Sequence, residues 1–228
     1  MSAVPAAIVK AFGQLGDRAV VAVLVKSIVI TLVVFAALGA GLYVALAEAG
    51  QRFGVSEGWA GLAAVLLVPI AMWLLFRVVA LVVLQFFADE VVAAVEARHY
   101  PALAGAARPL PLGREVALAT RGLMRALGYN LLALPLAAVL AFTAIGPALV
   151  FLAVNAVLLG REFTDMAWLR HCRGAERSNP SPLTERVLLG AAVAGMMLVP
   201  FLNFVAPVIG AAAGTHLVLR RIAAGEAR

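Results

Sequence analysis

The sequence predicts an all-α integral membrane protein with two long transmembrane helices and two re-entrant helical hairpins that penetrate the bilayer only partly. Three observations lead to this prediction. The chain has 228 residues and is 64% hydrophobic, which is more apolar surface than a soluble domain of this size can bury. Its charged residues lie mainly between long apolar runs. Two of those runs carry prolines near their middle, where a straight helix is interrupted.

Composition also narrows the class of protein. The formal net charge is +6 and is carried almost wholly by arginine, since Lys10 and Lys26 are the two lysines. In a membrane protein such an excess is typical of cytoplasmic loops near anionic lipid, and we expect no nucleic-acid partner. The single cysteine, Cys172, excludes an intrachain disulfide.

The sequence contains no pattern typical of an enzyme. A phosphate-binding Gly-x4-Gly-Lys-Ser/Thr loop, a Gly-x-Ser-x-Gly element and a His-Glu-x-x-His motif are all absent. The three histidines and Cys172 do not have metal-ligand spacing. We therefore expect neither an enzyme nor a bound cofactor or metal, and we interpret His216 as a packing residue.

Four segments precede the first broken run. Residues 1–18 carry apolar side chains at helical spacing, which predicts an N-terminal helix at the membrane interface. Residues 19–47 form an apolar run far longer than the core of a signal peptide, so we predict a retained transmembrane helix. A second transmembrane helix with a cytoplasmic extension is expected over residues 59–88. Residues 89–128 are expected to form cytoplasmic or interfacial helices.

The two C-terminal apolar runs are the broken ones. Gly146 and Pro147 interrupt residues 129–160, and the stretch from Pro200 to Asn203 interrupts residues 187–220. Each half of the first run holds only about 12 to 15 residues, roughly 20 Å of helix, whereas a bilayer core is about 30 Å thick. Each run is therefore predicted to enter the membrane and turn back, with its irregular backbone buried in protein or beside water.

The distribution of arginines predicts the topology. Residues 161–186 form a basic cytoplasmic loop between the hairpins, and further arginines precede the first hairpin and follow the second. If each broken run crossed the membrane once, the 161–186 loop would face outward, against the cytoplasmic preference of basic loops. Two hairpins keep every basic segment on one side. Two tight pairs of complete spans would give the same charge pattern.

Two stretches resemble a known family. The first comprises Gly160-Arg161-Glu162-Phe163 and Ala167-Trp168-Leu169-Arg170-His171, and the second is Val199-Pro200-Phe201-Leu202-Asn203-Phe204-Val205-Ala206-Pro207-Val208. Both resemble the CysZ sulfate permease family, which shares a domain with the etoposide-induced membrane proteins. The resemblance implies two long transmembrane helices, two pairs of partly penetrating helices, and assembly as a homodimer or higher homo-oligomer among membrane lipids. It also implies multi-pass insertion in the bacterial inner membrane and sulfate uptake for cysteine biosynthesis.

The resemblance suggests a sulfate site at the start of the first span. Family members carry a Gly-Leu-Arg element there that is associated with sulfate binding, and the matching positions in this chain are Gly16, Asp17 and Arg18. Glycine permits close backbone approach, the helix start supplies N–H donors, and arginine supplies positive charge. Asp17 departs from the family pattern and places a negative charge beside the site. Arg18 would also suit a simpler role as an anchor at the cytoplasmic interface.

Five further residues are candidates for a polar pathway: Lys26, Asn155, Arg161, Glu162 and Asn203. Arg161 could receive anions at the mouth of the first hairpin, and Glu162 could pair with another arginine and limit the strength of anion binding. Each candidate also has a structural interpretation: Asn203 would cap the returning half-helix, and Lys26 would extend its amine to the interface.

The small residues from Gly210 to Gly214 form a strip that permits close helix contact, either within the subunit or with a neighbouring one. Together these features support two functional hypotheses. In the first, the protein is a sulfate permease in which helix N-termini and arginines hold the anion on a polar path between half-helices of an oligomer. In the alternative, it is a non-conducting membrane scaffold or regulatory subunit that binds a cytoplasmic partner or anionic lipid.

Overall fold

The structure, a computed structural model, describes residues 3–52, 54, 68, 88–108, 110–172 and 179–225. All regular secondary structure in these residues is helical, which confirms the prediction of an all-α protein. Four described helices are long and apolar enough to cross a membrane, namely Arg18–Arg52, Val116–Phe142, Gly146–His171 and Leu202–Ala223. Apart from its last residue and residue 68, the span predicted over residues 59–88 lies outside the described residues.

The chain divides into two compact units. The first unit combines Met1–Val20 with Ala88–Arg228, and the second is Val21–Phe87. The described part of the second unit is mainly the body of α2, which runs over Arg18–Arg52 and contains the whole predicted span of residues 19–47. Its 35 residues correspond to about 50 Å of helix, which exceeds the thickness of a bilayer core by several turns.

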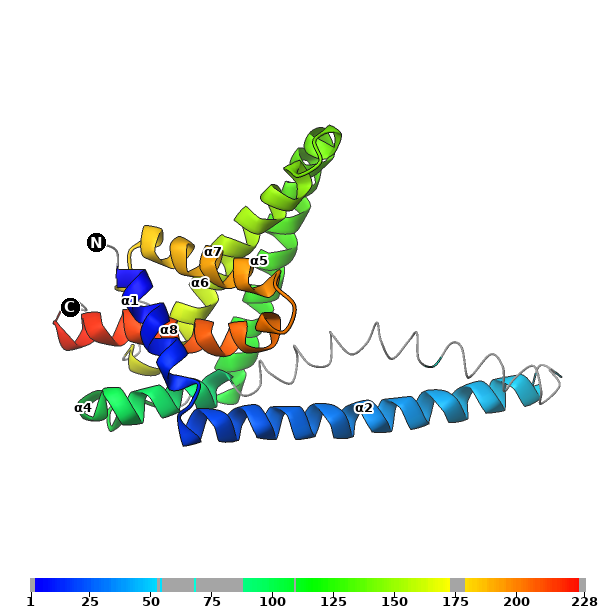
Figure 1. Cartoon of the computed structure of the whole chain (residues 1–228), viewed down its shortest axis with the longest axis horizontal. Helices are drawn as coiled ribbons and strands as arrows, with labels where there is room; N and C mark the ends of the chain where they lie inside the picture. The colour runs from blue at the N-terminus through cyan, green and yellow to red at the C-terminus, as the bar shows by residue number, and fades with distance from the viewer. Residues whose placement is uncertain are drawn as a thin grey trace. The chain divides into compact units, whose positions relative to one another are not determined.

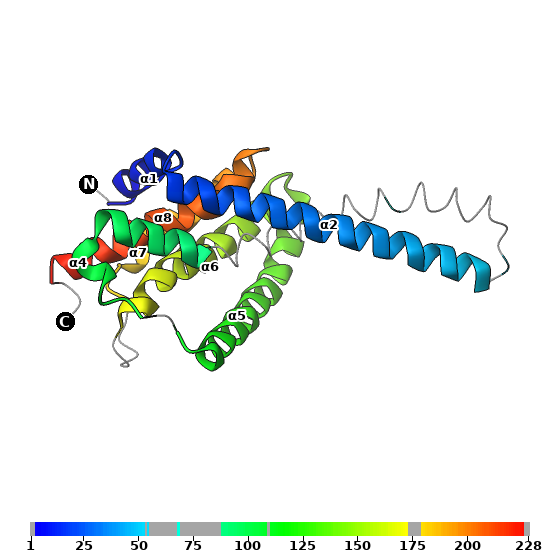
Figure 2. The ribbon, with the colours of Figure 1, turned by 90° about the horizontal axis from the view of Figure 1, so that it is seen from below.

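A helical hairpin in the first unit covers residues 129–160, the first broken apolar run. Helix α5 (Leu112–Val139) leads into a short 3₁₀ turn, η1 (Leu140–Phe142), and α6 (Gly146–His171) returns from it. Figures 1 and 2 show α5 and α6 meeting at this turn. Pro147 lies in the first turn of α6, where its missing N–H costs no helical hydrogen bond. The break predicted from Gly146-Pro147 is therefore the turn of the hairpin.

The helices of this hairpin are longer than the apolar halves of the run suggest. Helix α5 has 28 residues and α6 has 26, because the polar flanks continue the same helices. In particular, α6 runs on to His171, so the first part of the expected 161–186 loop is helical. Each helix is about 40 Å long, which is enough to cross a bilayer. Helix length alone therefore does not limit the hairpin to partial penetration.

Two further helices, α7 (Leu183–Met197) and α8 (Leu202–Ala223), lie on either side of the break in the second apolar run. The residue that caps α8 is Phe201, which has a positive φ of 64°, and no side-chain hydrogen bond closes this helix end. The expectation that Asn203 caps α8 is therefore wrong. Asn203 lies one residue inside α8, and its Oδ1 atom is buried without a hydrogen-bond partner in the described part of the chain.

Helix α8 forms the centre of the first unit. Every residue from Ala206 to Leu219 is buried, as expected for a helix that is apolar on all sides. Helices α6, α7 and α1 (Ala3–Gln14) all contact it, and α1 lies beside α8 in Figures 1 and 2. The face of α1 that carries Val4, Ala7 and Ala11 is buried. Part of the apolar face expected at the membrane interface is therefore used for packing within the protein.

Glycines bring the backbones of α6 and α7 into direct contact. A Cβ atom on Gly160 would collide with the main-chain carbonyl of Arg186, and a Cβ atom on Gly190 would collide with that of Ala156. One turn further along α6, the Phe163 ring occupies the space beside Gly210, and the Phe163 main chain occupies the space beside Gly214. The predicted small-residue strip of α8 therefore packs within the subunit, against α6.

We predict that Gly160→Ala destabilises the protein by about 1–3 kcal/mol, because the added methyl group must separate two helix backbones. Gly195→Ala in α7 is the matched control. Nothing lies within 4 Å of its added Cβ, so helix propensity should leave stability unchanged or raise it slightly. Thermal unfolding of both variants in detergent measures the difference. Equal melting temperatures for Gly160→Ala and wild type would contradict the backbone contact.

Candidate functional site

The predicted anion-binding element forms the turn between α1 and α2. The turn is closed by two hydrogen bonds: the Leu15 N–H donates to the Phe12 carbonyl at 3.2 Å, and the Asp17 N–H donates to the Gln14 carbonyl at 2.9 Å. Gly16 is exposed, and no atom lies within 4 Å of the position of a Cβ there. The first N–H groups of a helix lack acceptors in the helix and carry partial positive charge. The start of α2 is therefore an open and electropositive helix end.

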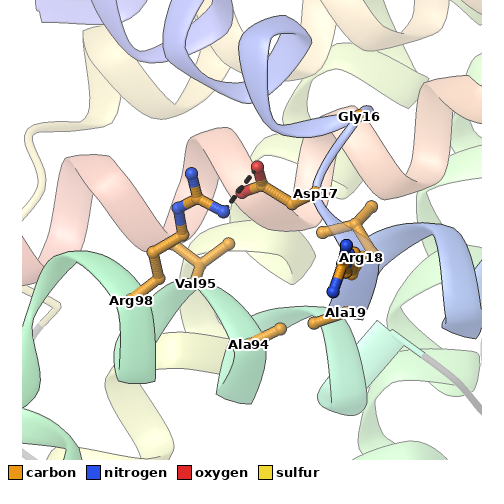
Figure 3. A pocket seen from close by; sticks show the side chains of 8 residues that line it. Gly16, Asp17, Arg18, Ala19, Ala94, Val95 and Arg98 are labelled. Carbon is orange, nitrogen blue, oxygen red and sulfur yellow. Dashed lines mark ion pairs between the residues drawn. The ribbon is translucent and has the colours of Figure 1, made fainter.

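This turn lines a pocket of about 400 Å³. Figure 3 shows that the turn supplies one side of the pocket and the helical segment of residues 88–99 supplies the other. The lining residues are Gly16, Asp17, Arg18, Ala19, Val20, Ala94, Val95 and Arg98. All of them belong to the first compact unit. The structure thus brings together two arginines and one carboxylate with small and apolar side chains around them.

Two of the three charged side chains in the pocket form an ion pair, and the third does not. Asp17 and Arg98 form an ion pair of 2.7 Å, in which the Asp17 side chain is 15% exposed and the Arg98 side chain 61% (Figure 3). Arg18 is exposed and has no hydrogen bond or ion pair in the described part of the chain. The three charges sum to a net charge of +1. An arginine without a partner beside a helix start can bind a small anion.

Arg98 was not among the site residues predicted from sequence. It lies about 80 residues from Arg18 along the chain, and no local motif connects the two. One weak signal was available, because Asp17 replaces an apolar residue of the family element and a carboxylate beside the apolar start of a span usually has a partner.

The predicted pathway residues on α6 lie outside the pocket. Arg161 and Glu162 are exposed, and the Nε atom of Arg161 lies 3.2 Å from the Asp165 carboxylate one turn along the helix. Asn155 is exposed as well, and its side-chain amide donates to the main-chain carbonyl of Phe151 at 2.8 Å. Lys26 and Asn203 do not line the pocket either.

A comparison with family profiles decides the classification. The profile of the family described as Sulfate transporter CysZ/Etoposide-induced protein 2.4 matches residues 7–207. The chain belongs to this family. The search of curated proteins gives no match. The match covers the Gly16–Arg18 turn, the first hairpin and the turn of the second. Membership in a transporter family agrees with several long apolar helices, and it supports a general role as a multi-pass sulfate transporter rather than an enzyme.

In this CysZ-family protein a buried ion-pair network holds the segment that carries Arg98. Glu96 is 1% exposed, and its two carboxylate oxygens accept hydrogen bonds from Arg170 at 3.0 and 3.2 Å. The His171 Nε2 atom lies 3.0 Å from the same carboxylate. The network attaches residues 88–99 to the C-terminal end of α6. It thereby fixes the position of the wall that Val95 and Arg98 contribute to the pocket.

The protonation of Glu96 reflects this network. Burial raises the pKa of a carboxyl group, but the hydrogen bonds from His171 and Arg170 and the charge of Arg170 outweigh burial, so the pKa of Glu96 lies below its ordinary value of 4.5. Glu96 is therefore ionised at neutral pH. Because this pKa is lowered in the folded state, ionised Glu96 stabilises the fold at pH values above the ordinary pKa. That stabilisation is lost as the pH falls through the folded-state pKa.

A second buried cluster holds the end of α1. The Gln14 amide nitrogen lies 2.8 Å from His216 Nε2, and the Tyr100 hydroxyl lies 3.0 Å from His216 Nδ1. The His99 ring packs edge-on against the His216 ring, with centroids 5.2 Å apart. Both ring nitrogens of His216 thus have side-chain partners, which agrees with its predicted packing role. Among the described residues, no cluster of three or more histidine, cysteine or acidic side chains could hold a metal ion.

We predict that Glu96→Gln lowers the free energy of unfolding at pH 7 by about 2 kcal/mol, because Arg170 and His171 lose their charged partner. The variant should also lose the part of the acid sensitivity that wild type shows below pH 4.5. Asp89→Asn, an exposed change on the same helical segment, is the control. Thermal unfolding in detergent from neutral pH to about pH 3 tests both statements. Identical curves for Glu96→Gln and wild type would refute the stabilising role of the network.

Proposed function

We propose that this protein is a permease of the bacterial inner membrane that mediates sulfate uptake for cysteine biosynthesis. The observation that carries the proposal is the pocket at the start of α2, where Arg18 has no partner in the described structure and the helix presents its first N–H groups. Membership in the sulfate transporter family supports the choice of sulfate. Gly16, Asp17 and Arg18 are the proposed substrate-binding residues.

The chemistry of the pocket suits sulfate. Sulfate is a dianion at neutral pH and accepts hydrogen bonds through four oxygens, so a metal ion is not needed to bind it. Arginine offers a planar fork of donors, and the helix start adds main-chain donors. Because Arg18 is exposed to solvent, the interaction is screened and weak. Weak binding suits transport, because the ion must also be released from the site.

The turns of the two hairpins support partial penetration of the membrane. Phe142 is 98% exposed at the first turn and Phe201 is 83% exposed at the second. Neither turn carries a charged residue. Thr143 donates a hydrogen bond to the Leu140 carbonyl at 2.7 Å and accepts one from the Gly146 N–H at 2.9 Å, which satisfies backbone groups that hydrocarbon cannot. We propose that both turns lie within the bilayer, as expected for two hairpins that penetrate the membrane only partly.

The remaining polar candidates belong to the proposed path. Lys26 lies on α2 about 12 Å beyond Arg18 along the helix axis. Asn155, Arg161 and Glu162 lie on α6, and Asn203 lies at the start of α8. We propose that sulfate leaves the Arg18 pocket and passes these groups between half-helices of a homo-oligomer, a dimer or larger. The many exposed apolar side chains of α5 would then face lipid or a neighbouring subunit.

The purified protein, reconstituted alone in liposomes, should move radiolabelled sulfate down its gradient. Arg18→Ala should weaken sulfate binding about tenfold, because it removes a charge-assisted hydrogen-bond donor. Binding is measured by calorimetry in detergent and flux by filtration of the vesicles. Arg52→Ala, at the opposite end of α2, serves as the charge control.

The outcome separates the two functional hypotheses. A scaffold or regulatory subunit would show no flux in the absence of a partner. Vesicles that contain folded protein and remain impermeable to sulfate would therefore contradict the permease. Flux that persists with unchanged affinity in Arg18→Ala would keep the permease and remove Arg18 from the site.

Cysteine labelling tests the topology. In a Cys172→Ser background, Leu183→Cys at the start of α7 should react with a membrane-impermeant maleimide only after the inner membrane is opened, because this connection is expected in the cytoplasm. Phe142→Cys at the first hairpin turn should react from neither side. Reaction of Phe142→Cys from the outer face would indicate a complete crossing instead of a re-entrant hairpin.

A further inference from the structure

We infer that Arg98 is a second arginine that binds the anion and that Asp17 is an internal counter-ion, competing with the anion for Arg98. The inference rests on the proposed sulfate site and adds two roles to it. Arg98 comes from the helical segment of residues 88–99, which no sequence motif connects to the Gly16–Arg18 turn. In the empty site, one of the two anion-binding arginines would then be paired with a carboxylate of the protein itself.

The geometry supports a shared guanidinium. The Asp17 and Arg98 side chains point toward one another across the pocket (Figure 3). Arg98 approaches Asp17 through its Nη1 atom at 2.7 Å, whereas a guanidinium has five N–H donors. With its side chain 61% exposed, Arg98 keeps donors accessible to a ligand in the pocket. Its partner is the more enclosed of the two, since the Asp17 side chain is 15% exposed.

The charge balance explains what Asp17 changes. A leucine at this position, as in the family element, would leave Arg18 and Arg98 as two positive charges facing a dianion. With Asp17 the net charge is +1, and the carboxylate repels an anion that enters the pocket. Electrostatic attraction is therefore reduced while both donors remain in place. In this chain Asp17 sets the affinity of the site.

Anion binding then becomes an exchange of partners. A sulfate oxygen that reaches Arg98 replaces or shares the contact with Asp17, so one charge-assisted hydrogen bond forms as another weakens. The net gain is smaller than for an arginine that has no partner, and the bound ion leaves more easily. When the pocket empties, Asp17 returns to Arg98 and neither charge remains without a partner.

The test uses the two halves of the ion pair, whose removal should have opposite effects. Arg98→Gln should weaken sulfate binding about tenfold, because a charged donor is lost. Asp17→Asn and Asp17→Leu should each tighten it by about three- to tenfold, because Arg98 becomes fully available and the repulsion disappears. Arg52→Gln removes one positive charge about 50 Å away along α2 and should leave affinity unchanged. Titration calorimetry with sodium sulfate in detergent gives each Kd.

Ionic strength provides a second measurement. Raising the salt concentration screens attraction between the pocket and the anion, so affinity should fall more steeply in Asp17→Leu than in wild type and less steeply in Arg98→Gln. Chloride-matched titrations at two salt concentrations measure these slopes. Thermal unfolding of each variant identifies any that is misfolded. If one Asp17 variant is misfolded, the other still tests the role of the carboxylate.

The outcomes are distinct. If the ion pair only held the fold together, both halves would change affinity in the same direction or not at all, and either result overturns the inference. Wild-type affinity in Arg98→Gln removes Arg98 from the site, and unchanged or weaker binding in both Asp17 variants removes the competition. If wild type itself binds no sulfate, the proposed function fails. If wild type binds and transports sulfate but these variants do not behave as expected, only the present inference fails.

Discussion

Direct backbone contact between α6 and α7 is the constraint on which the first unit depends. Because Gly160 and Gly190 have no side chains, each helix lies against a main-chain carbonyl of the other. Phe163 extends this contact to α8 through Gly210 and Gly214. In a membrane, where lipid is as apolar as the protein, such close packing is a main source of helix association. A chain rich in alanine and glycine can obtain it at many positions, and here it determines the position of α6.

The position of α6 in turn determines one wall of the candidate site. Arg170 and His171 at its C-terminal end hold Glu96, and the helical segment that contains Glu96 also carries Val95 and Arg98. The opposite wall is fixed through α8, since His216 lies beside Gln14, the last residue of α1. The pocket is thus assembled from two walls that are each attached to the packed helices by a buried polar contact.

The charges around this pocket would suit weak rather than tight binding of an anion. Tight binding of a dianion would favour an enclosed site with several positive charges, each without an internal partner. This pocket is open to solvent, and one of its two arginines is paired with Asp17. Both hairpin turns interrupt helical hydrogen bonds, and a side chain compensates for this at the first. Prolines break the helices there, yet Thr143 supplies partners for backbone groups at the first turn, so an apolar environment can accept it.

The sequence by itself determined the helical class and indicated where two of the apolar runs are interrupted. Apolar runs and prolines act locally through helix geometry, so Gly146-Pro147 predicts a turn wherever the rest of the chain lies. It also determined Gly16, Asp17 and Arg18 as candidates, because the family element is contiguous. Helix lengths were underestimated, since apolar composition does not reveal that a polar flank such as residues 161–171 continues the same helix. The expected cap at Asn203 was wrong because α8 begins at Leu202, so Asn203 already lies inside the helix.

Only the tertiary structure decided which distant charges meet. Arg98 and Glu96 lie two residues apart in sequence, yet Arg98 pairs with Asp17 at the start of α2 while Glu96 pairs with Arg170 at the end of α6. Their partners depend on how the helices pack, and packing depends on contacts between residues far apart in the chain. The number and spacing of charges do not predict those contacts. The second arginine of the pocket could therefore be identified only in the folded structure.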